Sequence, residues 1–483
     1  MTGIVAYGAY IPRLRLQRSA IHAANRWFAP GLGGLAKGER AIANWDEDTV
    51  TMAVEAARDC LAGRDRGSVR GICLASTSAP FADRQNAGIV KEALNLDDAV
   101  SSMDVGASRK AGTGALLNAL RATAGGGGEM LVVAGEKHRA QPGSEAEMTD
   151  GAAAAAMLVG TENVVARFIG AHSLTLDFVD QFRSADREFD YVWENRWIRD
   201  EGYLGIVGRA IGDALSLLGC KAQEIAHLIV PVPGRGIAET LAGKAGIAAT
   251  AVRDTLAATI GHAGAAHPLL MLADALAGAS PGDRILVVGF GQGADVLLFE
   301  ATDAIVQPAA GLGVAGWLSR RRAEDNYMKY LAFSGHLKMD LGMRAEFDQK
   351  QPLTALYRNR RTVLGLVGGR CTRTGAVQFP RSEISVAGNA ADRATQEDYP
   401  LADIPARVVS FTADQLGYTP DPPGYYGLVD FEGGGRMVCE FTDVDAGDVE
   451  VGRPMRMSFR IKAVDERRGF IRYFWKAVPQ QEA

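Results

Sequence analysis

Residues 104–120 read DVGASRKAGTGALLNAL, and they lead from an apolar strand through an acidic turn and a corner of small residues into a helix. In α/β enzymes such a corner usually displays a nucleophile, because a helix N-terminus lowers the pKa of a thiol and its amides help to stabilise an oxyanion. Here the corner carries Ser108, Arg109 and Lys110 instead. The stretch therefore predicts an α/β fold, and it raises the question of what an arginine does at such a corner.

The composition is that of a large globular protein. Of its 483 residues, 47% are hydrophobic and 23% are charged, which allows a sizeable core and argues against disorder. The net charge of −5 argues against a nucleic-acid binder, which would carry a basic stripe. No apolar run approaches the length of a membrane span, and the N-terminus is typical of a strand and not of a signal peptide. The five scattered cysteines fit free thiols in a reducing cytoplasm, where we expect the protein to reside.

The chain alternates β-branched runs with alanine-rich helical patterns up to about residue 300, and this alternation predicts a layered α/β fold with buried sheets. The pattern occurs twice. DGAAAAAMLVG at 150–160 closes the first half, and GADVLLFEA at 293–301 closes the second. After residue 368 the chain becomes β-rich with Pro/Gly turns, as is typical of a small barrel or sandwich.

GFGQGA at 289–294 has the glycine content of a dinucleotide-binding loop. A strand-like run, DVLLFE, follows it, so no helix N-terminus is available to bind a pyrophosphate. We interpret the segment as a tight hairpin between two strands.

Five segments together resemble the thiolase superfamily, in the branch that contains hydroxymethylglutaryl-CoA synthase and ketoacyl synthase III: GIVAYGAYIPRLRL, DEDTVTMAVEAA, DVGASRKAGTGAL, DGAAAAAMLVG and GFGQGADVLLFE. The likeness covers roughly residues 1–301. The C-terminal part resembles the zinc-ribbon plus OB-fold (DUF35-type) module that accompanies many thiolase-like proteins. The segments that carry this second match are GGRCTRTGAVQFPRSEIS, ARVVSFTAD, YYGLVDFEGGGRMVCEFTDVD and VGRPMRMSFRIK.

The resemblance implies an α/β, thiolase-like layered fold of two similar halves (α-β-α-β-α), followed by an all-β OB-fold module. The implied domains are an N-terminal half (1–165), a C-terminal half (166–302), a helical linker (303–367), a degenerate zinc ribbon (368–392) and the OB-fold module (393–483). It also implies a homodimer, because thiolase-like halves bury a sheet edge against a twin.

The family's catalytic positions carry other residues in this chain. The family's nucleophilic cysteine lies five residues after the aspartate of the strand, and that position, counted from Asp104, is Arg109. Thr77 replaces the glutamate base of a Ser-Glu-Ser-like triplet, and Val232 replaces a histidine. His262 lies where ketoacyl synthases carry an asparagine. A guanidinium is permanently protonated and cannot attack a thioester, which disfavours acyl transfer through a covalent intermediate.

The ribbon has lost its metal ligands as well. A structural zinc needs four soft ligands in a tetrahedron. The resemblance places Cys371, Thr374, Ser385 and Ala390 at these four positions. One cysteine cannot hold the metal, so we predict neither zinc nor another metal, and no cofactor besides the coenzyme A of the substrate.

The predicted catalytic residues are His262, Arg109, Ser108 and Thr77. Arg109 either binds a substrate carboxylate or an enolate through its planar fork, or is a structural arginine paired with Asp104 or Asp150. His262 is interpreted as an acid–base residue or oxyanion donor, with a packing or capping histidine as the alternative. Ser108 as a replacement nucleophile would lack its usual base, so that role is less favoured.

The predicted substrate-binding residues are Trp193 and Arg196, in the polar and aromatic insertion 177–203, and Gly291 in the hairpin. An interface with the C-terminal module is an equal alternative for the insertion. Residues 136–138, Glu-Lys-His, follow a core strand, and we expect a solvated loop there.

The favoured hypothesis is a thiolase-fold enzyme that acts on acyl-CoA thioesters by aldol or retro-aldol chemistry, because an enolate needs an oxyanion hole and a proton shuttle but no acyl-enzyme. The first alternative is an acyltransferase or condensing enzyme of the 3-oxoacyl or hydroxymethylglutaryl-CoA synthase type. The second is a non-catalytic CoA-binding or scaffold protein. The expected partners are the acyl-CoA substrate, a second copy of the chain and a thiolase or hydratase, with no nucleic acid and no membrane.

Overall fold

The computed structural model describes residues 1–307, 309–343, 352–388 and 390–480, and the chain folds into two compact units. The first unit consists of Met1–Asn44, Asp48–Gly88 and Leu96–Leu331, and the second of Trp45–Glu47, Ile89–Asn95 and Ala332–Ala483. Within the described ranges, no helix is long and apolar enough to cross a membrane.

The first unit is built on a nine-stranded mixed sheet with the order β11-β12-β13-β8-β1-β7-β6-β4-β5. Its strands are β1 (Gly3–Tyr10), β4 (Val69–Ala75), β5 (Ser101–Val105), β6 (Glu129–Lys137), β7 (Ala152–Gly160), β8 (Ala166–Thr175), β11 (Ile225–Ile229), β12 (Arg284–Phe290) and β13 (Gly293–Ala301). β1 and β8 pair only at Gly3↔Arg167 and Ile4↔Ala166. This short junction separates the two halves that the repeated sequence pattern predicts.

The remaining elements of this unit are short. The strands are β2 (Leu14–Gln17), β3 (Glu39–Ile42), β9 (Gln181–Phe182), β10 (Tyr191–Val192) and β14 (Arg322–Glu324). The helices are α1 (Arg18–Asn25), α2 (Thr49–Cys60), α4 (Ala111–Ala124), α5 (Glu145–Thr149), α6 (Asn195–Trp197), the π-helix η3 (Ile198–Val207), α7 (Gly208–Leu217), α8 (Ile237–Ala245), the 3-10 turn η6 (Gly264–Ala266), α9 (His267–Ala277) and α10 (Gly313–Ser319). Two further helices, α3 (Asn86–Ala93) and α11 (Tyr327–Phe333), run from one unit into the other.

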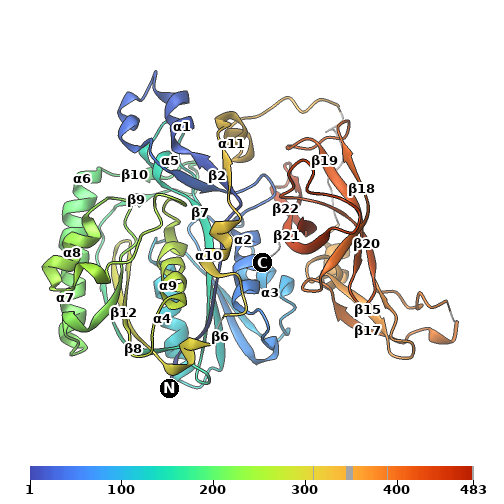
Figure 1. Cartoon of the computed structure of the whole chain (residues 1–483), viewed down its shortest axis with the longest axis horizontal. Coiled ribbons are helices and arrows are strands. Elements are labelled where there is room, and N and C mark those ends of the chain that lie inside the picture. The colour runs from blue at the N-terminus through green and yellow to red at the C-terminus, as the bar shows by residue number, and fades with distance from the viewer. Residues whose placement is uncertain (308, 344–351, 389, 481–483) are drawn as a thin grey trace. The chain divides into compact units, whose positions relative to one another are not determined.

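The helices form layers with the two halves of the sheet, as Figure 1 shows. Helix α2 packs on β1, β6 and β7. Helices α4 and α9 touch each other and lie in the middle, where α4 contacts β6 and β13, and α9 contacts β7 and β12. Helix α7 covers β8 and β13 on the outside of the second half. The α-β-α-β-α order expected from the sequence is confirmed.

Small residues allow the middle layer to pack closely. A Cβ on Gly112, in the first turn of α4, would lie 2.2 Å from the Ala265 carbonyl oxygen of η6. The central strand β7 is buried along its whole length, and five of its nine residues are alanines. A capping box of Asp48 and Thr51 begins α2, which satisfies amide groups that the helix leaves free. These features bring the N-terminus of α4 close to η6 and to the ends of the strands.

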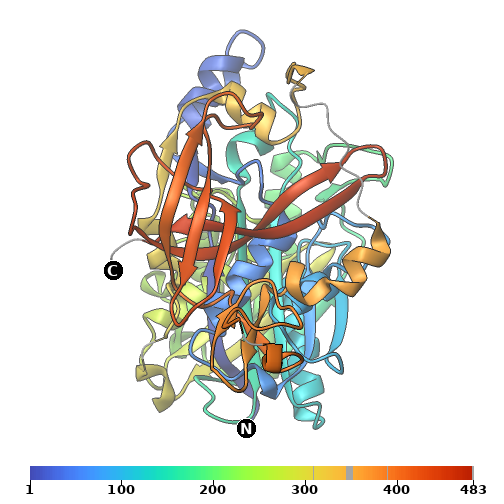
Figure 2. The same ribbon diagram turned by 90° about the vertical axis from the view of Figure 1, so that its right-hand side faces the viewer.

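The described part of the second unit includes two sheets and the short helices α12 (Leu353–Arg358) and α13 (Arg360–Val363). The five-stranded sheet has the order β20-β19-β18-β21-β22, and all of its pairings are antiparallel. Its strands are β18 (Ala406–Asp414), β19 (Gly424–Phe431), β20 (Arg436–Glu440), β21 (Pro454–Asp465) and β22 (Phe470–Pro479), with the long β21–β22 hairpin in dark red in Figure 2. A small sheet of β15 (Val367–Cys371), β16 (Val377–Gln378) and β17 (Gln396–Pro400) occupies the ribbon region.

Two segments allow a direct comparison with the expectations. β12 and β13 are antiparallel neighbours joined by a tight turn at residues 291–292, so the hairpin interpretation of 289–294 is confirmed. The predicted helical linker 303–367 contains a strand as well as helices, since β14 pairs in parallel with β2. Its residues up to Leu331 belong to the first unit.

Candidate active site

The corner between β5 and α4 keeps the geometry that the sequence predicts. β5 ends at Val105 and α4 begins at Ala111. The Asp104 carboxylate accepts hydrogen bonds from the backbone N–H groups of Asn86 and Ala87 and from the Asn86 side chain. Asp104 is therefore occupied at the start of α3, and its carboxylate is not the partner of Arg109.

Ser108 and Gly291 meet at this corner. The Ser108 hydroxyl donates to the Gly291 carbonyl at 2.9 Å, and its oxygen accepts from the Lys110 N–H at 3.2 Å. A Cβ on Gly291 would lie 2.8 Å from the Ser108 Oγ and 3.0 Å from the Arg109 nitrogen, at a φ of +154°. The β12–β13 hairpin thus lies directly against the corner, and only a glycine fits there.

The Arg109 guanidinium is buried beside acidic side chains. Its Nη2 lies 3.6 Å from the Asp150 Oδ2, and its side chain is 14% exposed. Its Nε and Nη2 are buried and make no hydrogen bond. Burial opposes the charge, but the carboxylates of Asp150 and Asp180 outweigh it and raise the Arg109 pKa. Of the two possible partners in the sequence, Asp150 is the one that Arg109 contacts.

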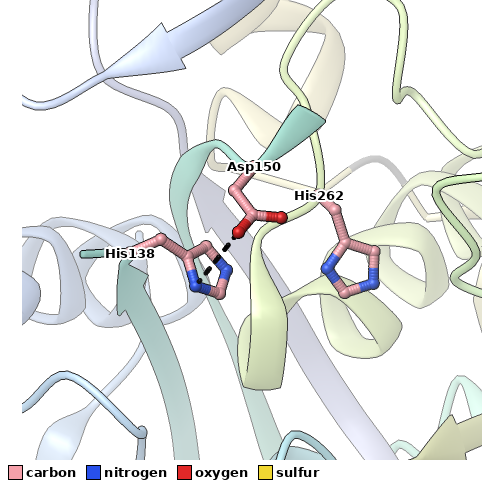
Figure 3. Close-up of side chains that lie close together, drawn as sticks. All are labelled: His138, Asp150 and His262. Carbon is pink, nitrogen blue, oxygen red and sulfur yellow. Dashed lines mark ion pairs between the residues drawn. The ribbon is translucent and has the colours of Figure 1, made fainter. Parts of the chain in front are cut away.

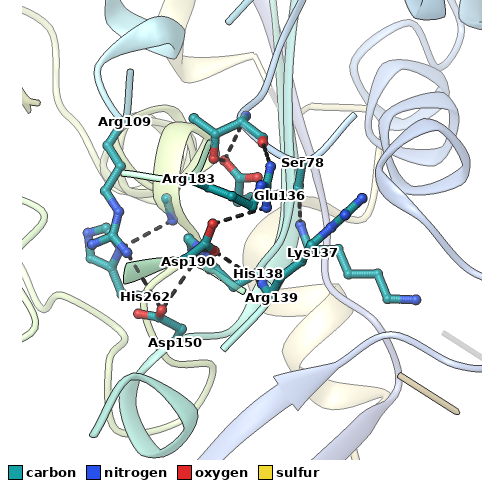
Figure 4. A network of polar contacts seen from close by, with 12 residues as sticks. Ser78, Arg109, Glu136, Lys137, His138, Arg139, Asp150, Arg183, Asp190 and His262 are labelled. Atoms are coloured by element: carbon teal, nitrogen blue, oxygen red, sulfur yellow. Dashed lines mark hydrogen bonds and ion pairs between the residues drawn. The ribbon is translucent and has the colours of Figure 1, made fainter. Parts of the chain in front are cut away.

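His138 lies directly after β6 and also faces Asp150, as Figure 4 shows. Its Nδ1 is 3.9 Å from the Asp150 Oδ2 and 3.8 Å from the Asp190 Oδ2, and its side chain is fully buried. Burial lowers the pKa of this imidazole, yet the two carboxylates raise it above its ordinary value in total. The expectation of a solvated loop at 136–138 is wrong for the His138 side chain, because β6 carries it into the interior.

Asp190 reaches this cluster from the insertion 177–203, and a guanidinium and a backbone N–H hold it in place. Its Oδ1 accepts from the Arg183 Nη1 at 3.0 Å, and its Oδ2 accepts from the Arg139 N–H at 3.2 Å. Burial raises the pKa of Asp190, but His138 and Arg183 lower it below its ordinary value in total. The insertion therefore supplies the site with a fixed carboxylate.

Glu136 lies at the end of β6 and is completely buried, which also contradicts the expected solvated loop. Its Oε2 accepts from the N–H and the hydroxyl of Thr77, at 3.2 and 3.1 Å, and from the Ala265 N–H at 3.3 Å. Ser76 donates to its Oε1 at 3.4 Å. Thr77 thus donates to a carboxylate of the neighbouring strand. These hydrogen bonds connect the ends of β4 and β6 to η6.

His262 is buried with its ring stacked on His267, at a centroid separation of 4.6 Å. Its Nδ1 accepts from the Gly264 N–H at 3.1 Å. Burial is the main cause that lowers its pKa well below the ordinary value, and the neighbouring His267 adds to it. The ring is therefore neutral and held by the backbone, close to the cluster that contains Arg109.

In the described ranges, one group of side chains is close enough together to hold a metal ion, and Figure 3 shows it: His138, Asp150 and His262. Each offers one ligand atom, and these atoms lie within 4.8 Å of one another. The Arg109 guanidinium lies 3.6 Å from the same Asp150 carboxylate. The Gly264 N–H occupies the Nδ1 lone pair of His262. A cation would meet a fixed positive charge here, so the donor set does not fit a metal.

The predicted substrate-binding residues Trp193 and Arg196 lie outside the buried cluster. Trp193 is 51% exposed, and its ring lies near that of Tyr191. Its backbone N–H donates to the Asp180 carbonyl at 2.9 Å. Arg196 is exposed in α6, where its N–H donates to the Glu194 carboxylate. Both residues thus belong to the surface of the insertion.

Sequence reasoning missed four acidic or basic members of the cluster: Glu136, His138, Asp180 and Asp190. A signal existed for the first two, since they follow a core strand, where loops of an α/β fold approach a substrate. The two aspartates lie in an insertion that contains many charged residues, and nothing local separates them from the solvated ones. Tertiary structure alone brings them to Arg109.

None of the five cysteines of the chain lies at the corner. Cys60 and Cys73 are buried in α2 and β4, and burial raises the pKa of Cys60 to about 12. Cys220 follows α7, and Cys439 is buried in β20. Cys371 ends β15 in the ribbon region, where its sulfur lies 3.2 Å from the Thr395 hydroxyl. The corner therefore has no thiol to offer a thioester.

Comparisons with known proteins agree with this architecture. The model of the 3-oxoacyl-[acyl-carrier-protein] synthase III C terminal matches residues 215–297, and that of the ChsH2 C-terminal OB-fold domain matches residues 399–460. A hydroxymethylglutaryl-CoA synthase of Thermococcus gammatolerans is 31% identical over 316 residues, which cover 64% of this chain and 87% of that protein. One from Caldivirga maquilingensis is 29% identical over 353 residues, covering 70% and 98%.

Solved structures share the fold of the first unit. A structure of HMG-CoA synthase complexed with CoA has a TM-score of 0.60 at 18% identity, covering 72% of this chain and 95% of that chain. The 3-oxoacyl-[acyl-carrier-protein] synthase III of Aquifex aeolicus has a TM-score of 0.55 at 20% identity, covering 62% and 100%. The thiolase-like layered fold and the C-terminal OB-fold module expected from the sequence are confirmed.

Proposed function

The chain belongs to the hydroxymethylglutaryl-CoA synthase family of thiolase-fold condensing enzymes, and we propose that it acts on acyl-CoA thioesters by aldol or retro-aldol chemistry without a covalent acyl-enzyme. The main support for this proposal is the residue that lies at the corner. The corner at the N-terminus of α4 presents the Arg109 guanidinium, 3.6 Å from Asp150, and a guanidinium has no lone pair with which to attack a thioester. The same group is well suited to bind the negative charge that develops on a thioester oxygen.

Aldol chemistry needs an anion-binding group and an acid–base group. An acyl-CoA enolate carries its charge on the thioester oxygen, and preorganised donors in a water-poor site stabilise such a charge strongly. Arg109 supplies two buried nitrogen atoms that make no hydrogen bond. His138 lies beside the same carboxylate, 3.9 Å from the Asp150 Oδ2. These two groups support bond-forming or bond-breaking chemistry at the carbon next to the thioester.

Acyl transfer through Ser108 has less support. Its hydroxyl proton is directed to the Gly291 carbonyl, which is no base, at 2.9 Å. A serine nucleophile needs a neighbouring base to remove its proton. The only other hydrogen bond of the Ser108 hydroxyl group in the described part of the chain comes from the Lys110 N–H.

A non-catalytic role as a CoA-binding or scaffold protein is the second candidate. The observation in its favour is the contact of Arg109 with Asp150, because an arginine whose role is only structural would also be paired and buried. Such a protein would bind CoA thioesters without altering them, or would associate with an active thiolase or hydratase.

The test is incubation of the whole chain with a panel of β-hydroxyacyl-CoA thioesters, followed by mass spectrometry of the thioesters and of the protein. The proposal expects a shortened acyl-CoA together with an aldehyde or ketone, and a protein of unchanged mass. An acyl adduct on the protein would favour acyl transfer. Unchanged thioesters with measurable CoA binding would favour the non-catalytic role.

A further inference from the structure

His138 is a buried imidazole whose nearest polar partners are carboxylates at 3.8 and 3.9 Å, longer than an ordinary hydrogen bond. Both ring nitrogens are buried without a hydrogen-bond partner, and the side chain is fully buried. Two carboxylates face one nitrogen, since the Nδ1 lies 3.9 Å from the Asp150 Oδ2 and 3.8 Å from the Asp190 Oδ2 (Figure 4). A buried polar group without a partner is unfavourable unless a ligand or water completes it. The ring is thus positioned and available.

Arg109 and His138 converge on the same oxygen atom. The Arg109 Nη2 lies 3.6 Å from the Asp150 Oδ2, and the His138 Nδ1 lies 3.9 Å from it. Each of the two side chains also has buried nitrogens that make no hydrogen bond. A substrate that places an anionic oxygen against Arg109 therefore has its neighbouring atoms within reach of the imidazole.

Charged groups from several elements surround this imidazole. Burial lowers its pKa, the carboxylates of Asp150, Asp190 and Glu136 raise it, and the Arg109 guanidinium lowers it. The carboxylates prevail, so the pKa lies above the ordinary value of 6.5. His262 faces His138 from the chain before η6, and it is neutral because burial lowers its pKa. His138 therefore changes charge at a higher pH than an exposed histidine.

We propose that His138 is the acid–base residue of this site, acting on a β-hydroxyacyl thioester whose thioester oxygen is bound by Arg109. This inference rests on the proposed function. In the cleavage direction the neutral imidazole takes the proton of the β-hydroxyl group as the Cα–Cβ bond breaks. The oxygen becomes the carbonyl of the released aldehyde or ketone, and the bonding pair of the carbon–carbon bond becomes the enolate.

The proton balance of this reaction needs only one such group. The imidazolium formed in the first step returns its proton to the α-carbon of the enolate, which yields the shortened acyl thioester and a neutral imidazole. No oxidant, reductant or metal takes part, and the condensation direction is the same sequence reversed. Asp190 is a positioning residue, since it orients the ring and favours the imidazolium, while Arg183 and the Arg139 N–H hold its carboxylate.

His262 is less suited to this role. The Gly264 N–H occupies its Nδ1, and its ring is stacked against His267. The Nδ1 of His262 is therefore taken by a backbone donor, whereas the Nδ1 of His138 faces two carboxylates at 3.8 and 3.9 Å.

The experiment compares His138→Gln, Asp190→Asn and His172→Gln in the whole chain, with retro-aldol cleavage measured as a function of pH. His172 is the matched control, because its Nε2 lies 3.7 Å from the Asp213 Oδ2 on the outside of the second half. We expect His138→Gln to lose about 10²-fold or more in kcat, as is typical for removal of an acid–base group. We expect His172→Gln to stay within about twofold of the parent, because its side chain lies near Asp213 of α7 and takes no part in the proposed reaction.

Asp190→Asn tests the same role of His138 if the His138→Gln protein fails to fold. Removing this carboxylate lowers the pKa of the imidazole, so the rising limb of the kcat–pH profile moves to lower pH. Nitrogen-15 NMR of the histidines checks the same displacement independently of activity. Cleavage by His138→Gln at the parent rate, or an unmoved profile in folded Asp190→Asn, would overturn the inference and leave the proposed function standing. A parent protein that cleaves no thioester would overturn both.

Discussion

Arg109 changes what the corner at the N-terminus of α4 can do. A thiolate at this place would be stabilised by the helix and would attack a thioester, whereas a guanidinium is already a cation and can only bind or orient. Its buried position beside Asp150 makes the charge costly unless it is paired, and an anionic substrate oxygen would add a second partner. The residue type alone therefore determines which classes of reaction stay open.

Replacing Arg109 tests its anion-binding role. We expect Arg109→Met to lower kcat for thioester cleavage by about 10²–10³-fold, the usual cost of removing one oxyanion donor. Arg109→Lys should recover part of the loss, because an ammonium keeps the charge without the planar fork. Arg167→Met, at an exposed pair with Glu300, is the control. An equal loss in the control, or no loss in Arg109→Met, would contradict this role.

His267 should make stability depend on pH. It is buried and neutral, with its Nδ1 accepting from the Ala263 N–H and its Nε2 bonded to the Thr255 carbonyl. Burial lowers its pKa from 6.5 to about 4, although the bond to Thr255 opposes the shift. As the pH falls from 6.5 towards 4, the unfolded chain binds a proton that the folded chain excludes.

The free energy of unfolding should therefore fall by about 1.4 kcal/mol per pH unit through His267 in that window. Urea unfolding at several pH values measures the slope. His267→Gln should show a shallower slope than the parent, and His172→Gln, at a partly exposed histidine, should show the parental one. Identical slopes in the parent and His267→Gln would contradict the assignment.

At the candidate site the carboxylate comes from β6, whereas the resemblance expected it at the end of the neighbouring strand β4. The end of β4 carries Thr77, which is no base, and the end of β6 supplies the Glu136 carboxylate to its N–H and hydroxyl. Because β4 and β6 are parallel neighbours, their carboxyl ends lie at the same edge of the sheet. Four donors satisfy this carboxylate, so it holds the ends of β4, β6 and η6 together.

The β12–β13 hairpin should control the position of the corner. A Cβ at Gly291 would lie 2.8 Å from the Ser108 Oγ and 3.0 Å from the Arg109 nitrogen. Gly291→Ala should therefore displace the corner and lower kcat by about 10²-fold, which is the typical cost of a small misplacement of catalytic groups. Gly212→Ala in α7, where a Cβ meets nothing within 4 Å, should keep full activity. Full activity in Gly291→Ala would show that the corner tolerates the shift.

The second unit contains a buried network of charges. The Arg460 Nη1 lies 3.3 Å from the Asp46 Oδ1 and 2.7 Å from the Glu47 Oε1. The Lys476 Nζ lies 3.0 Å from the Asp46 Oδ2. These four side chains are at most 2% exposed. Asp46 thus pairs with side chains of two strands, β21 and β22, more than four hundred residues later in the chain. Removing one partner from such a network leaves a buried charge uncompensated.

Asp46→Asn should destabilise this unit by about 3 kcal/mol, because it leaves two buried cations with fewer partners. Thermal unfolding followed by circular dichroism measures the change. Asp430→Asn, which breaks the exposed pair of Asp430 with Arg436, is the matched control and should cost less than about 1 kcal/mol. Equal effects of the two substitutions would show that the buried network contributes no more than a surface pair.

A homodimer remains the expectation for the whole molecule. Among the described residues β5 pairs only with β4, so it forms one edge of the large sheet, and its Met103 is 47% exposed. An open strand edge with an apolar side chain is a ready partner for a second copy. Light scattering should give twice the chain mass of 51.3 kDa. Met103→Glu should yield monomers, whereas Leu217→Glu, at an exposed leucine of α7, should not.

Much of the architecture was readable from local patterns. Alternating β-branched runs and helical patterns predict the layers, and the strand-like DVLLFE after GFGQGA predicts the β12–β13 hairpin that the structure contains. These predictions succeed because period and turn chemistry are local properties. The zinc-free ribbon and the domain boundaries remain predictions from the resemblance. The solvated loop at 136–138 was wrong, because burial of Glu136 and His138 depends on what covers the end of β6.

The sequence alone established the strand, corner and helix around DVGASRKAGTGALLNAL, and with Arg109 it established that the corner has no thiol nucleophile. It could not choose between Asp104 and Asp150 as the partner of that arginine, nor identify His138. Those answers depend on residues distant in the chain, because Asp190 lies in an insertion and Asp150 lies between α5 and β7. Pairing among buried charges is decided by distances of 3–4 Å in three dimensions, and no local pattern encodes them.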